Sequence, residues 1–135
     1  MVDQSPEGEG TMVFPNGHRY KGGFKQGQKH GYGEYYHTEN IWFKGHFAFD
    51  QKHGKGEYHN EETGIDCVAL YSQGKKNGLG TTTYRNGDIF GCNYVDDMLH
   101  GDGFFVDREA ETKFTGKWQD GFRNGPGTLK NNLNG

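Results

Sequence analysis

Histidines that recur at a fixed spacing are the first residues whose chemistry has to be tested. His30, His53 and His100 each stand directly before the first glycine of a Gly-x-Gly pair. Equivalent residues of neighbouring β-hairpins lie about 10 Å apart, whereas zinc ligands must all lie about 2 Å from one ion. This row therefore predicts a role in turns, and we expect no bound metal and no cofactor.

The Gly-x-Gly pairs and the repeated carboxylates do not support catalysis either. A dinucleotide loop needs Gly-x-Gly-x-x-Gly between a strand and a helix, but residues 31–36 lack the third glycine and continue as a strand. Glu34 and Glu57 lie one repeat apart, whereas glycosidase carboxylates lie within about 5 to 9.5 Å in a closed pocket. No nucleophile elbow or Ser-His-Asp order stands out. We therefore expect a non-enzymatic protein with no catalytic residues.

The composition favours a thin β-structure. Glycine supplies 24 of the 135 residues, aromatic residues make up 15%, and the net charge is −3, so no nucleic-acid partner is expected. No apolar stretch approaches the roughly 18 residues of a membrane span, and residues 1–7 lack the flank and apolar stretch of a signal peptide. The two cysteines, Cys67 and Cys92, are too few for a disulfide framework. We expect a reducing, cytoplasmic setting.

A repeat of 23–24 residues organises the whole chain. The first glycines of six Gly-x-Gly pairs are Gly8, Gly31, Gly54, Gly78, Gly101 and Gly125. An aromatic-x-small-x-aromatic segment, with Cys67 in place of its first aromatic residue in one repeat, precedes each pair from the second onward. Its period of two predicts a strand with one apolar face. A stretch rich in Gly, Asp and Asn then predicts a turn, and Gly-x-Gly-x-aromatic predicts a second strand. Each repeat is therefore expected to be one β-hairpin.

The expected organisation is a flexible segment over residues 1–7 followed by a repeat array over residues 8–135. The array's units start near residues 20, 43, 67, 90 and 114, with partial units at both ends. Asn16-Gly17 and Asn86-Gly87 predict turns that lead to the next unit. No segment shows the 3.6-residue period and caps of a helix, so successive hairpins should pair directly.

The motif over residues 20–33, Tyr-x-Gly-x-Phe-x-x-Gly-x-x-His-Gly-x-Gly, resembles the MORN repeat. The resemblance covers roughly residues 8–130, although Phe90-Gly91-Cys92 displaces one glycine by a position. It implies an all-β fold, namely an elongated, twisted, single-layer antiparallel meander of stacked β-hairpins with a groove. It also implies a structural scaffold in cytoskeletal assemblies, including ciliary radial spokes and complexes at the cell cortex.

The inward aromatic side chains are the candidate binding surface. A single-layer sheet cannot bury both faces, so we expect part of this surface to stay accessible and to bind a protein partner. The groove would be about 48 Å long, which matches a helix of about 32 residues. The alternative is that curvature closes the rings on one another. The candidate groove residues are Tyr20, Phe24, Phe43, Phe47, Tyr58, Tyr71, Tyr94, Phe105 and Trp118.

Two further surfaces depart from a plain hairpin repeat. Val68 and Leu70 are apolar at outward positions, so we expect either a chain terminus or a partner to cover them. The array is interrupted within a unit at both ends, so we expect either a piece of a longer array or open edge strands that pair with another chain, including a second copy.

A row of cations is expected along one long edge of the sheet, with Leu99 interrupting it. Such a row is either a solvated turn surface or a contact for anionic lipid head groups or an acidic partner. A phosphoinositide-binding membrane tether is thus the alternative function to a protein scaffold. The row consists of Lys29, Lys52, Lys76 and Arg123.

Overall fold

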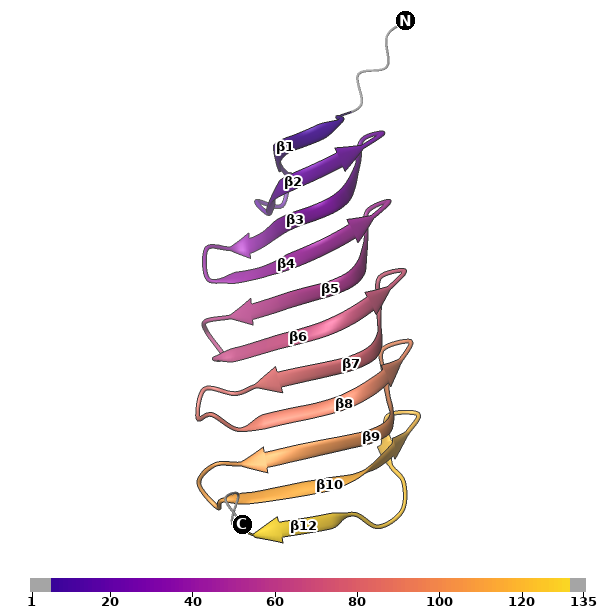
Figure 1. The fold of residues 1–135 in the computed structure, drawn as a ribbon. Helices are drawn as coiled ribbons and strands as arrows, with labels where there is room; N and C mark the ends of the chain where they lie inside the picture. Colours follow the sequence, from indigo (N-terminus) through magenta and orange to yellow (C-terminus); the bar gives the residue numbers. More distant parts are fainter. Residues whose placement is uncertain (1–5, 132–135) are drawn as a thin grey trace, which may run out of the picture.

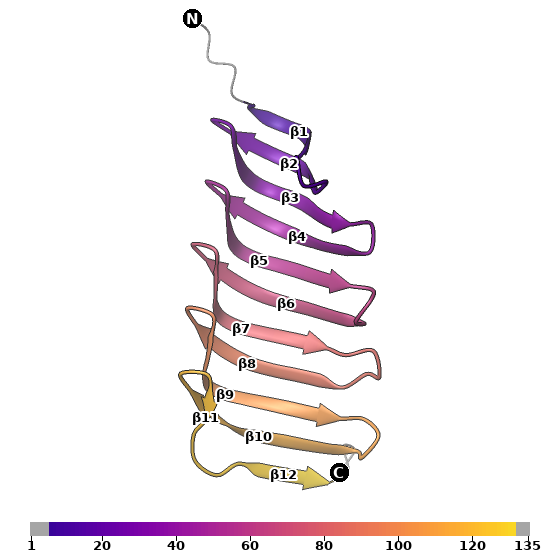
Figure 2. The same ribbon diagram turned by 180° about the vertical axis from the view of Figure 1, so that it is seen from behind.

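The computed structural model describes residues 6–131 and shows one twelve-stranded antiparallel sheet (Figure 1, Figure 2). From β1 to β11 each strand pairs with the next strand of the chain, and β12 pairs with β10. No helix occurs among the described residues, so the predicted all-β meander of hairpins is confirmed. The strands are β1 (Gly8–Val13), β2 (Arg19–Lys25), β3 (Gln28–Thr38), β4 (Ile41–Ala48), β5 (Gln51–Asn60), β6 (Ile65–Ser72), β7 (Lys75–Thr83), β8 (Ile89–Val95), β9 (Met98–Asp107), β10 (Thr112–Gln119), β11 (Phe122–Arg123) and β12 (Thr128–Asn131).

Residues 1–5 of the expected flexible segment lie outside the described residues. Just after them, the Pro6 carbonyl accepts a hydrogen bond from the Gly27 N–H at 3.0 Å, and the Glu7 carboxylate accepts one from the Gln26 N–H at 3.0 Å. These two residues therefore contact the turn between β2 and β3.

A two-residue turn closes each hairpin at one side of the sheet, and both of its residues have positive φ. Two consecutive positive φ values are the geometry of a type I′ turn, whose twist suits an antiparallel hairpin. Glycine and aspartate tolerate this backbone, which confirms the turn chemistry expected at this repeat position. The five turns are Gln26-Gly27, Phe49-Asp50, Gln73-Gly74, Asp96-Asp97 and Asp120-Gly121.

In the four central Gly-x-Gly pairs, the first glycine bends its strand. From Gly31 to Gly101 these glycines have φ between +87° and +101°, a region that favours glycine. The register changes at the same place, because Gly22 pairs with Gly33 but Phe24 pairs with Lys29. The later strand therefore holds two more residues than its partner between these pairs. The sharply curved ends of the odd-numbered strands β3 to β9 in Figure 1 show this bend.

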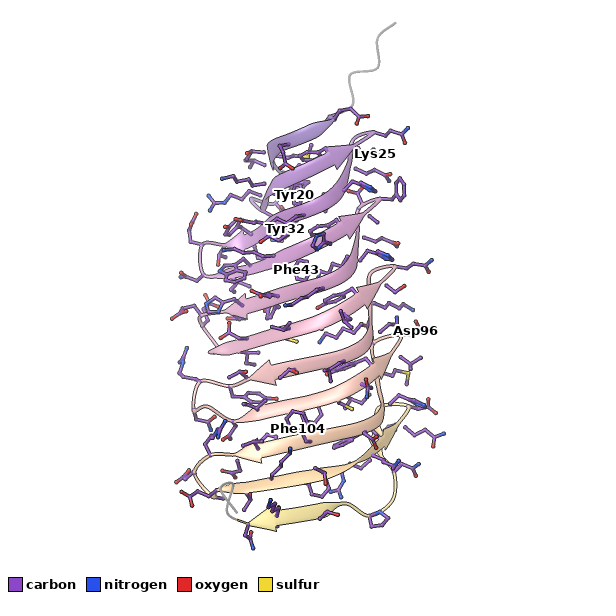
Figure 3. The ribbon with its side chains drawn as sticks, viewed as in Figure 1. Tyr20, Lys25, Tyr32, Phe43, Asp96 and Phe104 are labelled. Carbon is purple, nitrogen blue, oxygen red and sulfur yellow. The ribbon has the colours of Figure 1, made fainter. Side chains whose placement is uncertain are left out.

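The second glycine of each pair lies beneath an aromatic ring. A Cβ on Gly33 would overlap the ring of Tyr20, and a Cβ on Gly56 would overlap the ring of Phe43. Figure 3 shows Tyr20 and Phe43 over the middle of the sheet. The rings therefore obtain their packing surface from bare backbone, which a single-layer sheet needs because it has no second layer to supply it.

The rings then pack on each other along the array. Tyr20 meets Phe47 edge-on at a centroid distance of 5.4 Å, and Phe43 meets Tyr71 edge-on at 5.5 Å. Tyr20 is fully buried, and its hydroxyl donates a hydrogen bond to the Gly23 carbonyl at 3.0 Å. Burial, with a smaller contribution from carboxylates nearby, raises the pKa of Tyr20 to about 12. This chain of edge-to-face rings is the core of the protein.

Candidate functional site

The face that carries Tyr20 and Phe43 is called the inner face below. Three of the nine candidate groove residues, Tyr58, Tyr94 and Phe105, are half-buried on it. The other six are buried because curvature has closed their rings on one another. The accessible aromatic surface is therefore smaller than the nine candidate residues together would give. Whether this face binds a partner stays a prediction. The six buried residues are Tyr20, Phe24, Phe43, Phe47, Tyr71 and Trp118.

The cation row does not project from an edge, as expected from the sequence, but extends over the rings of the inner face. The Lys52 ammonium lies 4.3 Å from the ring centroid of Phe43, and the Lys76 ammonium lies 5.1 Å from that of Tyr94. The Arg123 guanidinium lies 4.3 Å from the ring centroid of its neighbour in β10, Phe114. The bend explains the difference, because it brings the start of each later strand over rings of its own hairpin and of the next one. Contacts of this kind each stabilise by about 0.5–2 kcal/mol, depending on desolvation.

The lysines of the cation row differ in the carboxylates that lie beside them. The Lys29 ammonium lies 3.7 Å from Asp50, whose carboxylate also accepts the Lys29 backbone N–H at 2.7 Å. Asp97 accepts the Lys76 backbone N–H in the same way at 2.7 Å. Burial, and next the Lys76 ammonium, lower the pKa of Lys52, while Asp97 offsets part of that effect. The surroundings of Lys52 therefore disfavour its charge.

A pocket of about 390 Å3 opens between Lys29 and Lys52. Phe43 and Phe47 contribute apolar surface to it, and His37 adds an imidazole. Burial lowers the pKa of His37, and the neighbouring His18 and Lys52 lower it further. The pocket thus combines an apolar lining with donors, an arrangement suited to an anionic group attached to an apolar body. The remaining lining residues are Tyr35, Asp50, Gln51 and Gly74.

The opposite, outer face carries the apolar patch expected at Val68 and Leu70. Their exposed fractions are 40% and 44%, and Leu79 joins them at 53%. These three residues line a depression of about 240 Å3 together with Lys55 and Thr81. Within residues 6–131 no segment lies over the patch, so the expected covering terminus is not found there. Leu79 was not singled out from the sequence, although its place between two glycines gives it the same outward direction as Tyr32 two repeats earlier.

The outer face changes character along the array. Cross-strand neighbours on β2 to β5 alternate in charge, from Lys21 to Glu34 to Lys44 to Glu57, and this ladder ends at Val68 on β6. Opposite charges across strands stabilise a sheet modestly. The apolar patch therefore begins where the charge pairing stops.

The described residues give no support for a metal or thiol centre. Among residues 6–131, no group of three or more His, Cys, Asp and Glu side chains is placed to hold a metal ion. Cys67 and Cys92 are buried and free, and burial raises the pKa of the Cys92 thiol. The same part of the chain holds no helix long and apolar enough to cross a membrane.

Hairpins of one pattern, stacked edge to edge into a single sheet, define a β-repeat protein. The family model of the MORN repeat matches residues 6–19, 20–39, 43–60, 70–89 and 114–131, about two thirds of the chain, and the chain belongs to this family. A comparison with curated proteins gives no match. The unmatched residues 90–113 hold most of β8 and all of β9, which continue the same meander although Gly91 is displaced from the pattern. MORN repeats are typically protein or membrane interaction modules and are generally non-enzymatic.

Proposed function

We propose that this protein is a non-catalytic scaffold that holds a protein segment, a helix, along its inner face. The observation that carries the proposal is the pocket of about 390 Å3 between Lys29 and Lys52, which leaves part of the ring surface open to a partner. Half-buried aromatic side chains beside the buried rings, at Tyr35, Tyr58 and Phe105, extend this surface along the array.

The dimensions of the sheet suit a long, straight partner. Strands spaced by about 4.8 Å advance about 9.6 Å per hairpin, so five hairpins extend over about 48 Å. A helix of about 32 residues has that length. Such a helix would meet the half-buried rings with its apolar face and the cation row with its polar face.

The test is to capture a partner from a cytoskeleton-rich extract and then locate it on the sheet. Acetylation of surface lysines, followed by mass spectrometry, compares the free and bound states. We expect protection of Lys29, Lys52 and Lys76 on the inner face, whereas Lys21 and Lys44 on the outer face serve as matched controls. Equal reactivity of the inner lysines in both states would refute binding on this face.

A second candidate function rests on the same cation row. Four cationic side chains, one in each of four repeats, offer a contact for phosphoinositide head groups. Sedimentation with phosphoinositide vesicles tests it. Lys52→Glu/Lys76→Glu removes the cation–π contacts of both lysines, so the thermal midpoint should fall. At a temperature where the melt shows the variant still folded, its recruitment to the vesicles should be abolished. Loss of vesicle binding together with intact partner binding would favour the membrane tether.

The proposal extends to the assembly and its place in the cell. We infer a cytoplasmic setting in a cytoskeletal structure, such as a cilium or the cell cortex, from the family resemblance alone. In residues 6–131, β1 and β12 each pair on one side, so a second copy could add at either edge. Sedimentation equilibrium tests this homodimer, and a monomer at high concentration would exclude it.

A further inference from the structure

One lysine of the inner row lacks a carboxylate that its neighbours have. In three of the hairpin turns the second residue lies beside the row lysine of the preceding repeat. In two of them this residue is an aspartate, Asp50 beside Lys29 and Asp97 beside Lys76. Beside Lys52 the same position is Gly74.

The backbone at this position is the same in all three repeats. The N–H of Gly74 donates to the Lys52 carbonyl at 2.9 Å, and those of Asp50 and Asp97 donate to Lys29 and Lys76 at 2.9 Å each. All three turn residues also share a positive φ, at 84° for the glycine and 69° and 70° for the aspartates. The repeats therefore differ here in one side-chain carboxylate and not in chain path.

The Lys52 ammonium is held in place over aromatic rings. It lies 4.3 Å from the ring centroid of Phe43 and 5.3 Å from that of Tyr71. The pocket described above opens beside it, and Gly74 forms part of the pocket lining. A half-buried ammonium that faces an open pocket gains most from an incoming anion, because charge-assisted hydrogen bonds strengthen where water is partly excluded.

We propose that the Lys52 ammonium binds the carboxylate of an aspartate or glutamate side chain on the bound helix, which takes the place that Asp50 fills beside the Lys29 ammonium in the preceding repeat. The inference rests on the proposed function and names the chemistry of the partner: an amphipathic segment with an acidic anchor between apolar residues. A protein side chain fits better than a membrane surface because the Lys29 side chain beside the pocket is 18% exposed. Asp50 in the same lining would repel a doubly charged phosphate more strongly than a singly charged carboxylate.

The chain offers a substitution that supplies the missing carboxylate. Gly74→Asp adopts the turn backbone that Asp50 and Asp97 already show, and its Cβ would meet only Gln51, at 3.9 Å. We expect the variant to fold with an unchanged or higher thermal midpoint. Its new carboxylate should pair with the Lys52 ammonium and so compete with a partner's acidic side chain.

A matched control and a second variant accompany it. Gly121→Asp places the same side chain in the equivalent turn of the last hairpin, where the residue of the preceding repeat is Leu99 and no atom lies within 4 Å of the new Cβ. Lys52→Met removes the charge and keeps an unbranched side chain over the rings, so the proposal stays testable if Gly74→Asp fails to fold.

The probe is a displayed library of random 24-residue helical peptides, selected on the immobilised wild-type chain. We expect the enriched peptides to share an Asp or Glu at one position. Its change to Asn or Gln should weaken binding to the wild type about tenfold and leave binding to Gly74→Asp unchanged. Gly74→Asp and Lys52→Met should each weaken the acidic peptides about tenfold, and Gly121→Asp should leave them unaffected.

The other outcomes separate the inference from the function beneath it. Peptides that bind the inner face without a shared acidic residue, or that bind Gly74→Asp as tightly as the wild type, overturn the inference and leave the scaffold intact. A library that yields no binder overturns both. Phosphoinositide vesicles that bind the wild type but not Gly74→Asp, with no peptide selected, would make Lys52 a phosphate contact and overturn the proposal.

Discussion

The packing of Phe43 over Gly56 predicts a strong energetic coupling between the two residues. A Cβ on Gly56 would meet three ring atoms of Phe43 first, and the ring is 2% exposed with other rings around it. Gly56→Ala must therefore push a confined ring out of its place, and over-packing of this kind costs about 1–3 kcal/mol in unfolding free energy. The backbone at this position can hold an alanine without strain, because Gly56 has no positive φ.

A double-mutant cycle measures this coupling, and its second variant removes the ring of Phe43. Phe43→Ala alone should cost about 3–5 kcal/mol. In that background the new methyl group enters vacated space, and alanine in a strand is favoured over glycine by about 0.5–1 kcal/mol. Gly56→Ala should thus change from destabilising to neutral or stabilising, which corresponds to a coupling of about 2 kcal/mol or more.

The unfolding free energies of the wild type, the two single variants and the double variant are measured by guanidinium unfolding. The unfolding is followed by circular dichroism and by the fluorescence of Trp42 in the same hairpin. Phe43→Leu replaces Phe43→Ala if the latter does not fold. Gly10→Ala is the control, because its Cβ would lie at an ordinary 3.5 Å from Phe24, and it should be neutral. Additive costs for Phe43 and Gly56 would refute the reasoning that the glycine exists to hold the ring.

Three further measurements test other contacts. Asp50→Ala removes the acceptor of the Lys29 N–H and should lower the unfolding free energy in denaturant by about 1 kcal/mol; an unchanged midpoint contradicts this. Hydrogen bonds, the largest from Asp66, raise the pKa of His59 above 6.5, so melting temperatures should favour wild type over His59→Gln below that pH. This advantage disappears as the pH rises through the raised pKa, and a constant difference would count against the hydrogen bond. Because the pKa of Tyr20 is raised to about 12 from 10.0, the stability of the wild type should fall relative to that of Tyr20→Phe as the pH rises between these values, and an equal pH dependence in the two chains would disprove the burial argument.

Most of the fold could be predicted from the sequence because its causes are local. Alternation of aromatic and small residues selects strands, and glycine or aspartate in consecutive turn positions selects hairpins. The resemblance added the expected single layer. The two glycines of each pair look alike in sequence, but Gly31 bends the strand at positive φ while Gly33 lies under the ring of Tyr20. That division of roles depends on where the ring comes to rest.

The residue types of the candidate site could be predicted from the sequence, but the position of the lysines over the inner face could not. The sequence contains the lysines, the rings and the alternation of glycine and aspartate at the turns, and none of these needs the fold to be noticed. Their meeting depends on the two additional residues in the later strand of each hairpin, which turn Lys29 and Lys52 over the inner face. A period-two pattern carries no information about such a bulge, so an edge position was expected.

The sequence by itself thus determined the period, the strands, the turns and the all-β class, because backbone preferences and side-chain alternation act within a few residues. Only the tertiary structure decided which side chains share a surface. It buried most of the expected groove rings, brought the lysines over them, and left Lys52 beside Gly74 where its neighbours have an aspartate. These outcomes depend on contacts between residues about 20 positions apart, which hairpin stacking and strand bending create together.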